Sequence, residues 1–264
     1  MDAIYKIAHG ATRRLVRNLT IYNFLRRLML IRMKVFRTLV ENDFTVFSAA
    51  PPNQGLILDI GANGGQSAVA FSFLCPTHSI VSFEPNPTLA GELRFAAKLI
   101  GDRFSFFQVG LASDKGTRTL YVPKIGKLPI EARASLDRDA AMQEMESLRK
   151  KFHGSAEIHE TEVHICRLDD FGFSPDIIKI DVEGTEHLVL EGARSTIQNS
   201  RPLILLEKGP SEARCKEVLR EWGYEFYEFD GVGSGSLKSA DVAGAINYFA
   251  IPQGWKNALR TYLP

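Results

Sequence analysis

The stretch of sequence that decides the fold is LILDIGANGGQS, from Leu56 to Ser67. An apolar run leads to an acid, Asp59, and is followed by a glycine-rich turn and then by a helix-like sequence. This is how a parallel strand passes into a helix in an open α/β sheet, with the backbone N–H groups of the turn directed at a ligand. The sequence therefore predicts a nucleotide-like ligand beside this loop.

The spacing of the glycines excludes two common nucleotide loops. Counted from Gly61, the third position of the dinucleotide fingerprint G-x-G-x-x-G is Asn63 and the sixth is Gln66. No Lys follows Gly65, as a P-loop would require. The remaining pattern suits a cofactor with an adenosine but no phosphates, of which S-adenosylmethionine (SAM) is the obvious one. Asn63 can replace a glycine because it tolerates a left-handed conformation. An ordinary βα turn with spare glycines is the alternative.

The next apolar run, SIVSFEPNP, contains a second acid at the tip of a strand. Glu84 follows the glycine loop by about 20 residues, where a ribose-binding carboxylate is expected. Pro85 and Pro87 end the strand and begin a helix. A solvated acid is the alternative, but this spacing favours ribose binding.

From Gly55 onward, short apolar runs alternate with helix-like segments. The expected strands span residues 56–60, 80–84, 104–109, 177–181, 203–207, 225–228 and 248–251. The expected helices span residues 66–73, 88–100, 186–198 and 212–222. This pattern predicts a mostly parallel, seven-stranded α/β sheet with helices on both faces. The last two strands should form an antiparallel pair.

A second stretch with candidate functional residues is PDIIKIDVEGTEHLVLEGA, residues 175–193. Its strand ends in Asp181, and Glu183 follows in a turn. Four acids are expected along the same sheet edge: Asp59, Glu84, Asp181 and Glu207. Because a buried, unpaired carboxylate is costly, we expect a ligand, metal or cation to pair with them.

The N-terminal region, residues 1–50, is predicted to be a basic amphipathic helical extension. Residues 1–40 contain nine Lys and Arg against one acid, Asp2, and apolar residues recur there at helical spacing. We expect a helical cap packed on the domain with its arginines facing water. Contact with an anionic membrane surface is one alternative, and an acidic substrate or nucleic acid is another.

The main domain is expected to span residues 51–264. Its alternation of strands and helices is interrupted between residues 121 and 169. Residues 131–151 are polar and helix-prone, and residues 157–166 alternate as a half-exposed strand does. We interpret an insertion at about 123–162 as a candidate substrate lid, since long excursions of this kind are often functional. The alternative is an insertion that lies far from the site and has no functional role.

The composition places limits on the class of protein. The chain has 264 residues, 45% of them apolar, and a formal net charge of +1, which fits one sizeable globular domain. Its three cysteines are scattered and support neither a disulfide framework nor a zinc site. With no transmembrane run and no evident signal peptide, we expect a cytoplasmic protein, with peripheral membrane contact as the alternative.

Several segments resemble the FkbM family of SAM-dependent methyltransferases, in the family's order, from about Leu56 to Lys208. The matching segments are LDIGANGGQS, VSFEPNP, GLASDKGTRTLYVP, ASL at 134–136, CRLDDF, PDIIKIDVEGTEHLVLEGA and RPLILLEK. The resemblance implies a class I, Rossmann-like methyltransferase domain and transfer of a methyl group to a hydroxyl. Family substrates include sugars and natural-product hydroxyls, so we expect a small-molecule, glycan or glycolipid acceptor. Nucleic acid is a less favoured acceptor.

The motifs and the resemblance together give candidate roles. The expected cofactor-binding residues are Asp59, Gly61, Asn63, Gly65, Gln66, Ser67, Glu84, Asn86, Ala112 and Asp181. A hydroxyl acceptor must lose its proton, and the candidate catalytic residues for this are Asp181, Glu183 and His187. The alternatives for Glu183 and His187 are a helix-start acid and a solvated helix residue.

We expect no metal, but a magnesium ion held by Asp181 and Glu207 is a minority alternative. Lys208 argues against the metal because it could pair with Glu207 instead. Two other hypotheses remain: a domain that binds SAM or a related adenosine ligand without catalysis, and a nucleic-acid methyltransferase that uses the basic N-terminus.

Overall fold

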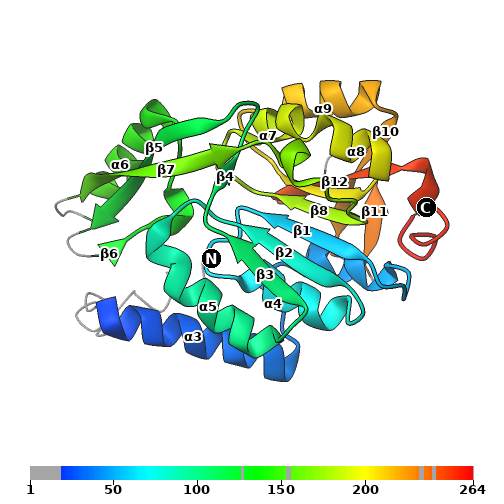
Figure 1. The fold of residues 1–264 in the computed structure, drawn as a ribbon, viewed down its shortest axis with the longest axis horizontal. Coiled ribbons are helices and arrows are strands. Elements are labelled where there is room, and N and C mark those ends of the chain that lie inside the picture. Colours follow the sequence, from blue (N-terminus) through cyan, green and yellow to red (C-terminus); the bar gives the residue numbers. More distant parts are fainter. Residues whose placement is uncertain (1–18, 126–127, 153–155, 232–234, 240–241, 264) are drawn as a thin grey trace.

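A computed structural model describes residues 19–125, 128–152, 156–231, 235–239 and 242–263 of the chain. These residues form two β-sheets with helices packed around the larger one (Figure 1). The strands of the larger sheet are β1 (Leu56–Ile60), β2 (Ser79–Phe83), β3 (Phe104–Phe107), β8 (Ile177–Ile180), β9 (Leu203–Glu207), β10 (Tyr224–Asp230), β11 (Ser236–Lys238) and β12 (Asn247–Pro252). Their order across the sheet is β11-β10-β12-β9-β8-β1-β2-β3.

The larger sheet is parallel on one side and antiparallel on the other. Neighbouring strands from β9 to β3 pair in parallel, and β12, β10 and β11 continue the sheet in antiparallel register. The α/β class, the parallel sheet and the antiparallel pair β10–β12 agree with the sequence prediction. The described residues add an eighth strand, β11, which the prediction missed because a three-residue strand has too little periodicity to recognise.

Helices cover both faces of the larger sheet (Figure 1). One layer contains α3 (Leu19–Phe36), α4 (Gln66–Leu74) and α5 (Ala90–Ile100), and the other contains α7 (Glu186–Gly192), α8 (Arg194–Ser200) and α9 (Glu212–Glu221). Each face of the sheet packs into its own hydrophobic cluster, and successive residues of a strand belong to opposite clusters. On β1, for example, Ile57 belongs to one cluster and Leu58 to the other. Burial on both faces explains why the central strands are continuously apolar.

One expected helix, over residues 186–198, is divided into α7 and α8 at Ala193. Gly192 lies against the backbone of Ala112, where an added Cβ would be 1.9 Å from the carbonyl oxygen. This close approach depends on the tertiary packing, so helical periodicity along the sequence could not reveal it.

Where the alternation of strands and helices is interrupted after β3, the chain forms a second, four-stranded sheet with the order β4-β7-β5-β6. Its strands are β4 (Gly110–Leu111), β5 (Gly116–Ile125), β6 (Leu128–Pro129) and β7 (Ala156–Cys166). A short 3-10 helix, η3 (Glu131–Arg133), and α6 (Arg138–Phe152) connect β6 to β7. The polar helix and the half-exposed strand were expected, but the sheet that they join was not.

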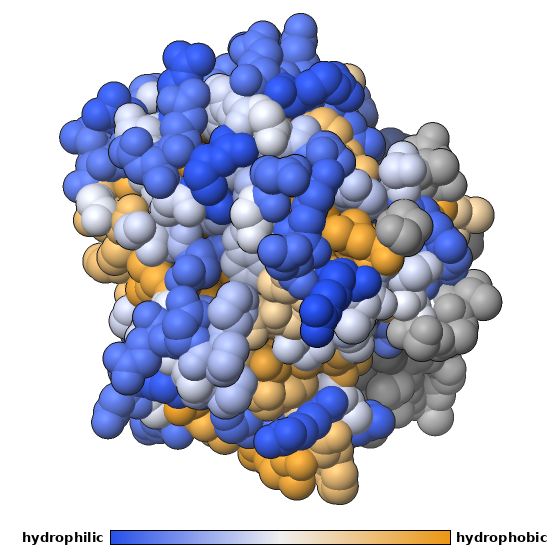
Figure 2. Space-filling model, turned by 90° about the vertical axis from the view of Figure 1, so that its right-hand side faces the viewer, coloured by the Kyte–Doolittle hydropathy of each residue, from blue (hydrophilic) through white to orange (hydrophobic). Residues whose placement is uncertain are grey.

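Helix α3 packs on the domain as expected of a cap, and the 3-10 helix η1 (Asn42–Ala49) follows it. Leu30 and Met33 on its inner face belong to the same buried cluster as residues of α4 and β1. Arg27 and Arg32 are exposed as expected, but Arg26 is buried. The outer face of α3 carries apolar side chains, and hydrophobic residues gather at this end of the molecule (Figure 2). Among the described residues, no helix is both long and apolar enough to cross a membrane.

Candidate functional site

A cavity of about 490 Å³ lies at the carboxyl ends of β1, β2 and β8. Residues 60–63 of the glycine loop, with Gln66 and Ser67 of α4, form one wall, and Met29 and Met33 of α3 form another; Gly65 does not line the cavity. The insertion contributes Glu131, Ala134 and Leu136. The cavity therefore lies where three parts of the chain meet, at the edge where open α/β sheets bind ligands.

The glycine loop has the conformation that its sequence predicts. Gly61 has φ 77°, and an added Cβ would lie 1.7 Å from the carbonyl oxygen of Asp181. Gly65 has φ 89° at the start of α4, where a Cβ would lie 2.8 Å from that of Ala96. Asn63 is left-handed with φ 47°, as expected of a residue that replaces glycine.

Asp59 lies beneath the cavity and is not among the residues that line it. In the sheet it is the register partner of Ser82 on β2 and of Lys179 on β8. Ser82 donates a hydrogen bond to Asp59 at 2.8 Å, and Ser67 of α4 donates another at 2.7 Å. The side chain of Asp59 thus fixes residues around the cavity, and Ser67 is one that lines it.

Lys179 is a functional candidate that the sequence reasoning missed. Its ammonium group lies 3.0 Å from a carboxylate oxygen of Asp181 and 3.8 Å from one of Asp59, and donates to the carbonyl of Gly61 at 2.8 Å. Burial alone would lower the pKa of Lys179, but the carboxylates of Asp181 and Asp59 outweigh it and raise the pKa. A lone Lys among isoleucines, opposite the strand position of Asp59, was the available signal.

Glu84 lines the cavity, and its buried carboxylate is held by the backbone. It accepts hydrogen bonds from the N–H groups of Asn63 at 2.8 Å and Asn86 at 2.9 Å. Burial raises the pKa of Glu84 to about 7, although these hydrogen bonds act in the opposite direction. A further hydrogen-bond donor, such as a ligand hydroxyl, would stabilise the ionised form of a carboxyl group in this environment.

The other expected cofactor-binding residues divide into two groups. Gln66 lines the cavity, whereas Asn86 and Ala112 do not. The side chain of Asn86 caps the turn that precedes α5 by accepting from Thr88. Ala112 is buried at the end of β4, and residues 109–111 occupy the cavity wall before it.

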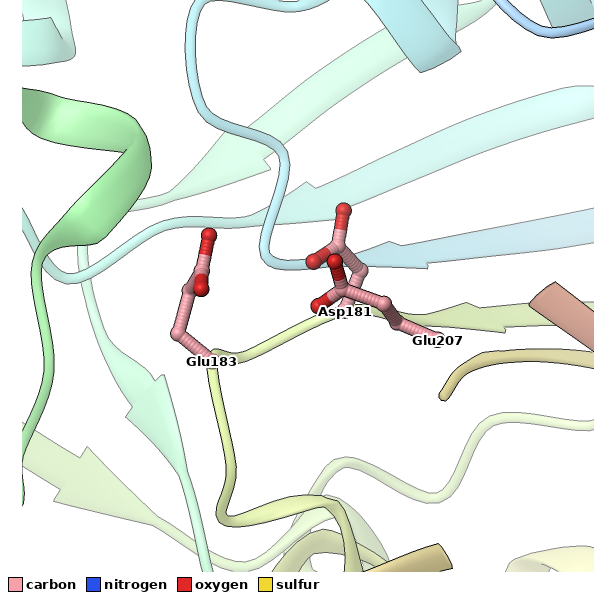
Figure 3. Close-up of side chains that lie close together, drawn as sticks. All are labelled: Asp181, Glu183 and Glu207. Carbon is pink, nitrogen blue, oxygen red and sulfur yellow. The ribbon is translucent and has the colours of Figure 1, made fainter. Parts of the chain in front are cut away.

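Three carboxyl groups converge beside the cavity (Figure 3). Oxygen atoms of Asp181, Glu183 and Glu207 all lie within 4.8 Å of one another. Burial and the charge of Asp181 raise the pKa of Glu183 to about 8. Burial, with the charges of Asp181 and Glu183, also raises the pKa of Glu207. Asp181 is paired with Lys179, and the raised pKa values of Glu183 and Glu207 favour their protonated forms.

His187, the remaining catalytic candidate, is not among the residues that line this cavity. It lies in the first turn of α7, and its Nδ1 is buried without a hydrogen-bond partner among the described residues. Glu183 precedes the helix in a left-handed turn with φ 58°, so the shared helix face expected for the two side chains is not formed.

Lys208 does not pair with Glu207, although that possible pair was the argument against a metal. Its ammonium group pairs with Glu228 at 2.7 Å. A second cavity of about 300 Å³ lies beside Glu207 and Lys208, and Glu183 and Arg133 also line it. Glu183 lines both cavities, so it lies between them.

Arg26 joins the three walls of the larger cavity and was also missed. Its guanidinium forms a buried ion pair with Glu131 of the insertion and donates to the Asn63 side chain at 2.7 Å. Gly64 leaves room for this group, since an added Cβ would lie 2.3 Å from Arg26. The partners of Arg26 are 105 and 37 residues away, which explains why local sequence patterns did not identify it.

The open sheet, the glycine loop and the acid after β2 define an α/β protein with a cavity suited to a nucleoside-containing ligand. The Methyltransferase FkbM domain model matches residues 59–226. The chain therefore belongs to the FkbM methyltransferase family.

The chain is 31% identical over 158 residues to the 2-O-methyltransferase NoeI of Sinorhizobium fredii, a match that covers 55% of this chain and 60% of NoeI. A crystal structure of a methyltransferase FkbM from Methylobacillus flagellatus is 12% identical with a TM-score of 0.49, covering 87% of this chain and 59% of that one. A precorrin-6y C5,15-methyltransferase from Geobacter metallireducens is 13% identical with a TM-score of 0.45, covering 80% and 86%. The chain thus spans about 60% of the length of NoeI and of the Methylobacillus protein.

Proposed function

We propose that the chain is a SAM-dependent O-methyltransferase that acts on a hydroxyl of a sugar, glycolipid or natural product. The observation that carries the proposal is the single cavity in which a backbone-held Glu84 and the carboxyl groups of Asp181 and Glu183 face the glycine loop. Membership of the FkbM family and the name of the relative NoeI support the same reading.

The residues around the cavity fit SAM by size and by charge. A volume of about 490 Å³ is within the range of about 300–1,000 Å³ that is usual for small-ligand sites. Glu84 offers its carboxylate to a ribose diol, and Gln66 offers an amide at the start of α4. Glu183, which lines the cavity and has no ion pair among the described residues, favours a cationic ligand, because an opposite charge stabilises its ionised form.

In this account each residue around the cavity has a separate task. Bound SAM supplies an electrophilic methyl group on a cationic sulfonium. Asp181, held by Lys179, stabilises the positive charge, and Asn63, Gln66 and Ser67 provide polar atoms along the wall formed by the glycine loop and α4. Much of the rate enhancement then comes from alignment of the acceptor hydroxyl with the methyl group.

Glu183 is the proposed general base, since it lies between the two cavities. The acceptor oxygen gains the methyl group as the bond from that carbon to sulfur breaks, which leaves S-adenosylhomocysteine, and the hydroxyl proton passes to the carboxylate of Glu183. A pKa of about 8 suits this task, because an effective base has a pKa near the operating pH. His187 is less favoured because it does not line the cavity.

We further propose that the smaller cavity receives the acceptor. Its lining includes Arg133, Ser135 and Glu144 of the insertion, which can hydrogen-bond to a polyhydroxylated molecule. This gives the insertion at about 123–162 the role of a substrate cover. The name 2-O-methyltransferase of the relative NoeI is consistent with a sugar hydroxyl as the acceptor.

The test is methyl transfer from SAM labelled on the methyl group to panels of saccharides, glycolipid extracts and small-molecule hydroxyls. We expect labelled methyl ethers from the wild type and strongly reduced product from Glu183→Gln, with SAM binding retained. Glu146→Gln, an exposed acid of α6, is the matched control and should be unaffected. Binding without transfer to any acceptor class would instead support a non-catalytic SAM-binding domain.

Metal assistance is the alternative to a free carboxylate base, favoured by the convergence of Asp181, Glu183 and Glu207. In that case a divalent ion would lower the pKa of the acceptor hydroxyl. Activity that persists after treatment with EDTA excludes this alternative, and activity that is lost and restored by Mg²⁺ supports it.

A further inference from the structure

The outer face of α3 is apolar although it faces away from the core. Phe24, Leu28, Ile31 and Val35 recur at spacings of four, three and four residues, so they lie on one side of the helix. Phe24 is 59% exposed and Val35 is 65% exposed. Figure 2 shows hydrophobic residues at the lower end of the molecule, where Figure 1 places α3. A contiguous exposed patch of this kind indicates an interaction surface.

Basic side chains border the apolar face. By helical spacing Arg27 lies on one flank of the face and Arg32 on the other, and both are exposed. Residues 19–36 contain four basic residues and no Asp or Glu. An apolar stripe flanked by cations, on a helix too polar to span a bilayer, is the pattern of a helix that lies in the plane of an anionic membrane.

The charge distribution of the whole chain favours one orientation. Residues 1–40 contain nine Lys and Arg and one acid, while the formal net charge of the chain is only +1, so the remainder is net acidic. An anionic surface would therefore attract the region of α3 and repel the rest of the molecule. A second copy of the chain is a poorer occupant, because a two-fold contact would place the basic flanks of both copies together.

We infer that the outer face of α3, formed by Phe24, Leu28, Ile31 and Val35, docks on an anionic lipid membrane. Met29 and Met33 of the same helix line the larger cavity, so docking holds that cavity close to the lipid surface. If the proposed function holds, a membrane-bound chain meets acceptor hydroxyls that are carried by glycolipids. The docking itself does not depend on that function.

The experiment is flotation of the full chain with vesicles of phosphatidylcholine, with and without phosphatidylglycerol. We expect the wild type to float with the anionic vesicles, less at high salt, and weakly with phosphatidylcholine alone. Leu28→Glu with Val35→Glu should reduce flotation by roughly tenfold or more, because two charges enter the docking face. Met142→Glu with Ile246→Glu alters two exposed apolar residues elsewhere and is the matched control.

Absence of flotation of the wild type with anionic vesicles overturns the inference, as does an equal loss in the two double variants. Sedimentation and thermal unfolding accompany the flotation. A wild-type dimer that the Leu28→Glu, Val35→Glu variant converts to a folded monomer, without flotation, would assign the face to self-association. Titration with S-adenosylhomocysteine without vesicles keeps the questions separate, since a chain that binds this ligand but no vesicles refutes docking alone.

Discussion

At the scale of single residues, the chemistry of the site depends on acids whose surroundings differ. Glu84 accepts two backbone hydrogen bonds and Asp181 is paired with Lys179, whereas the carboxyl group of Glu183 has no such partner among the described residues. These differences explain why the same functional group is assigned to ribose binding, to charge stabilisation and to proton transfer.

Glu183 gives a prediction about pH. As a general base it must be ionised, and its pKa is raised to about 8, so kcat/KM should increase as the pH rises through about 8. Measurement of kcat/KM between mildly acidic and alkaline pH checks this. Glu183→Gln should lack this rise and should have a lower plateau. An identical pH profile in that variant would exclude Glu183 as the base.

Lys179 gives a prediction about stability. Lys179→Met leaves the carboxylates of Asp59 and Asp181 facing each other without a cation, which should lower the free energy of unfolding by about 3–5 kcal/mol. Chemical denaturation measures the change. The pair of Lys256 with Glu225 at the surface provides the control, since Lys256→Met should leave the free energy of unfolding nearly unchanged. Asp181→Asn added to Lys179→Met should recover part of the loss; no recovery would argue against this pairing.

The sequence could place the acids at one sheet edge because strand ends and turns have local signals. Glu84, Asp181 and Glu183 all line the cavity, as does the glycine loop. The direction of a side chain within a turn has no such signal, which is why Asn86 and His187 do not face the cavity as the sequence analysis expected. Arg26, with partners far away in the chain, could not be predicted at all.

At the scale of elements, the alternation of strands and helices was predictable and the second sheet was not. The central strands are short apolar runs bounded by turns, which is a strong local pattern. In β5, Pro123 interrupts a polar strand, and its partner β7 follows only after α6. Such a long-range pairing is fixed by tertiary contacts, so from the sequence the insertion could be recognised only as an interruption in the alternation of strands and helices.

The contact of α3 with the insertion gives a prediction at this scale. Arg26→Met removes the cation that holds Glu131 and Asn63, so we expect weaker binding of S-adenosylhomocysteine, by about tenfold, and a loss of about 3 kcal/mol in the free energy of unfolding. Calorimetry and denaturation measure the two effects, with Arg27→Met as the neighbouring exposed control.

Arg26→Met combined with Glu131→Met separates positioning from stability. An apolar replacement of a buried ion pair is often neutral, so the free energy of unfolding should recover while the affinity stays low, because Asn63 still lacks its partner. Recovery of both quantities would show that Arg26 has no positioning role.

At the scale of the whole molecule, the cavity is assembled from the N-terminal helix, the sheet edge and the insertion. A ligand that touches all three should slow their opening together. Hydrogen exchange with and without S-adenosylhomocysteine should therefore show added protection in residues 26–36 and 131–136 as well as in residues 61–67. Protection confined to the glycine loop would contradict a cavity closed by all three parts.

We propose that this cavity binds SAM with Glu84 at the ribose. Titration calorimetry of the wild type with S-adenosylhomocysteine, which has the ribose but no reactive methyl group, tests it most directly. We expect saturable binding at one site, displaced by SAM, and about 10-fold to 100-fold weaker binding to Glu84→Gln, because a hydrogen bond to a charged group is worth about 1.5–3 kcal/mol. Glu225→Gln, an exposed acid, should bind as the wild type does. No binding by the folded wild type, or equal affinity in Glu84→Gln, would contradict the claim.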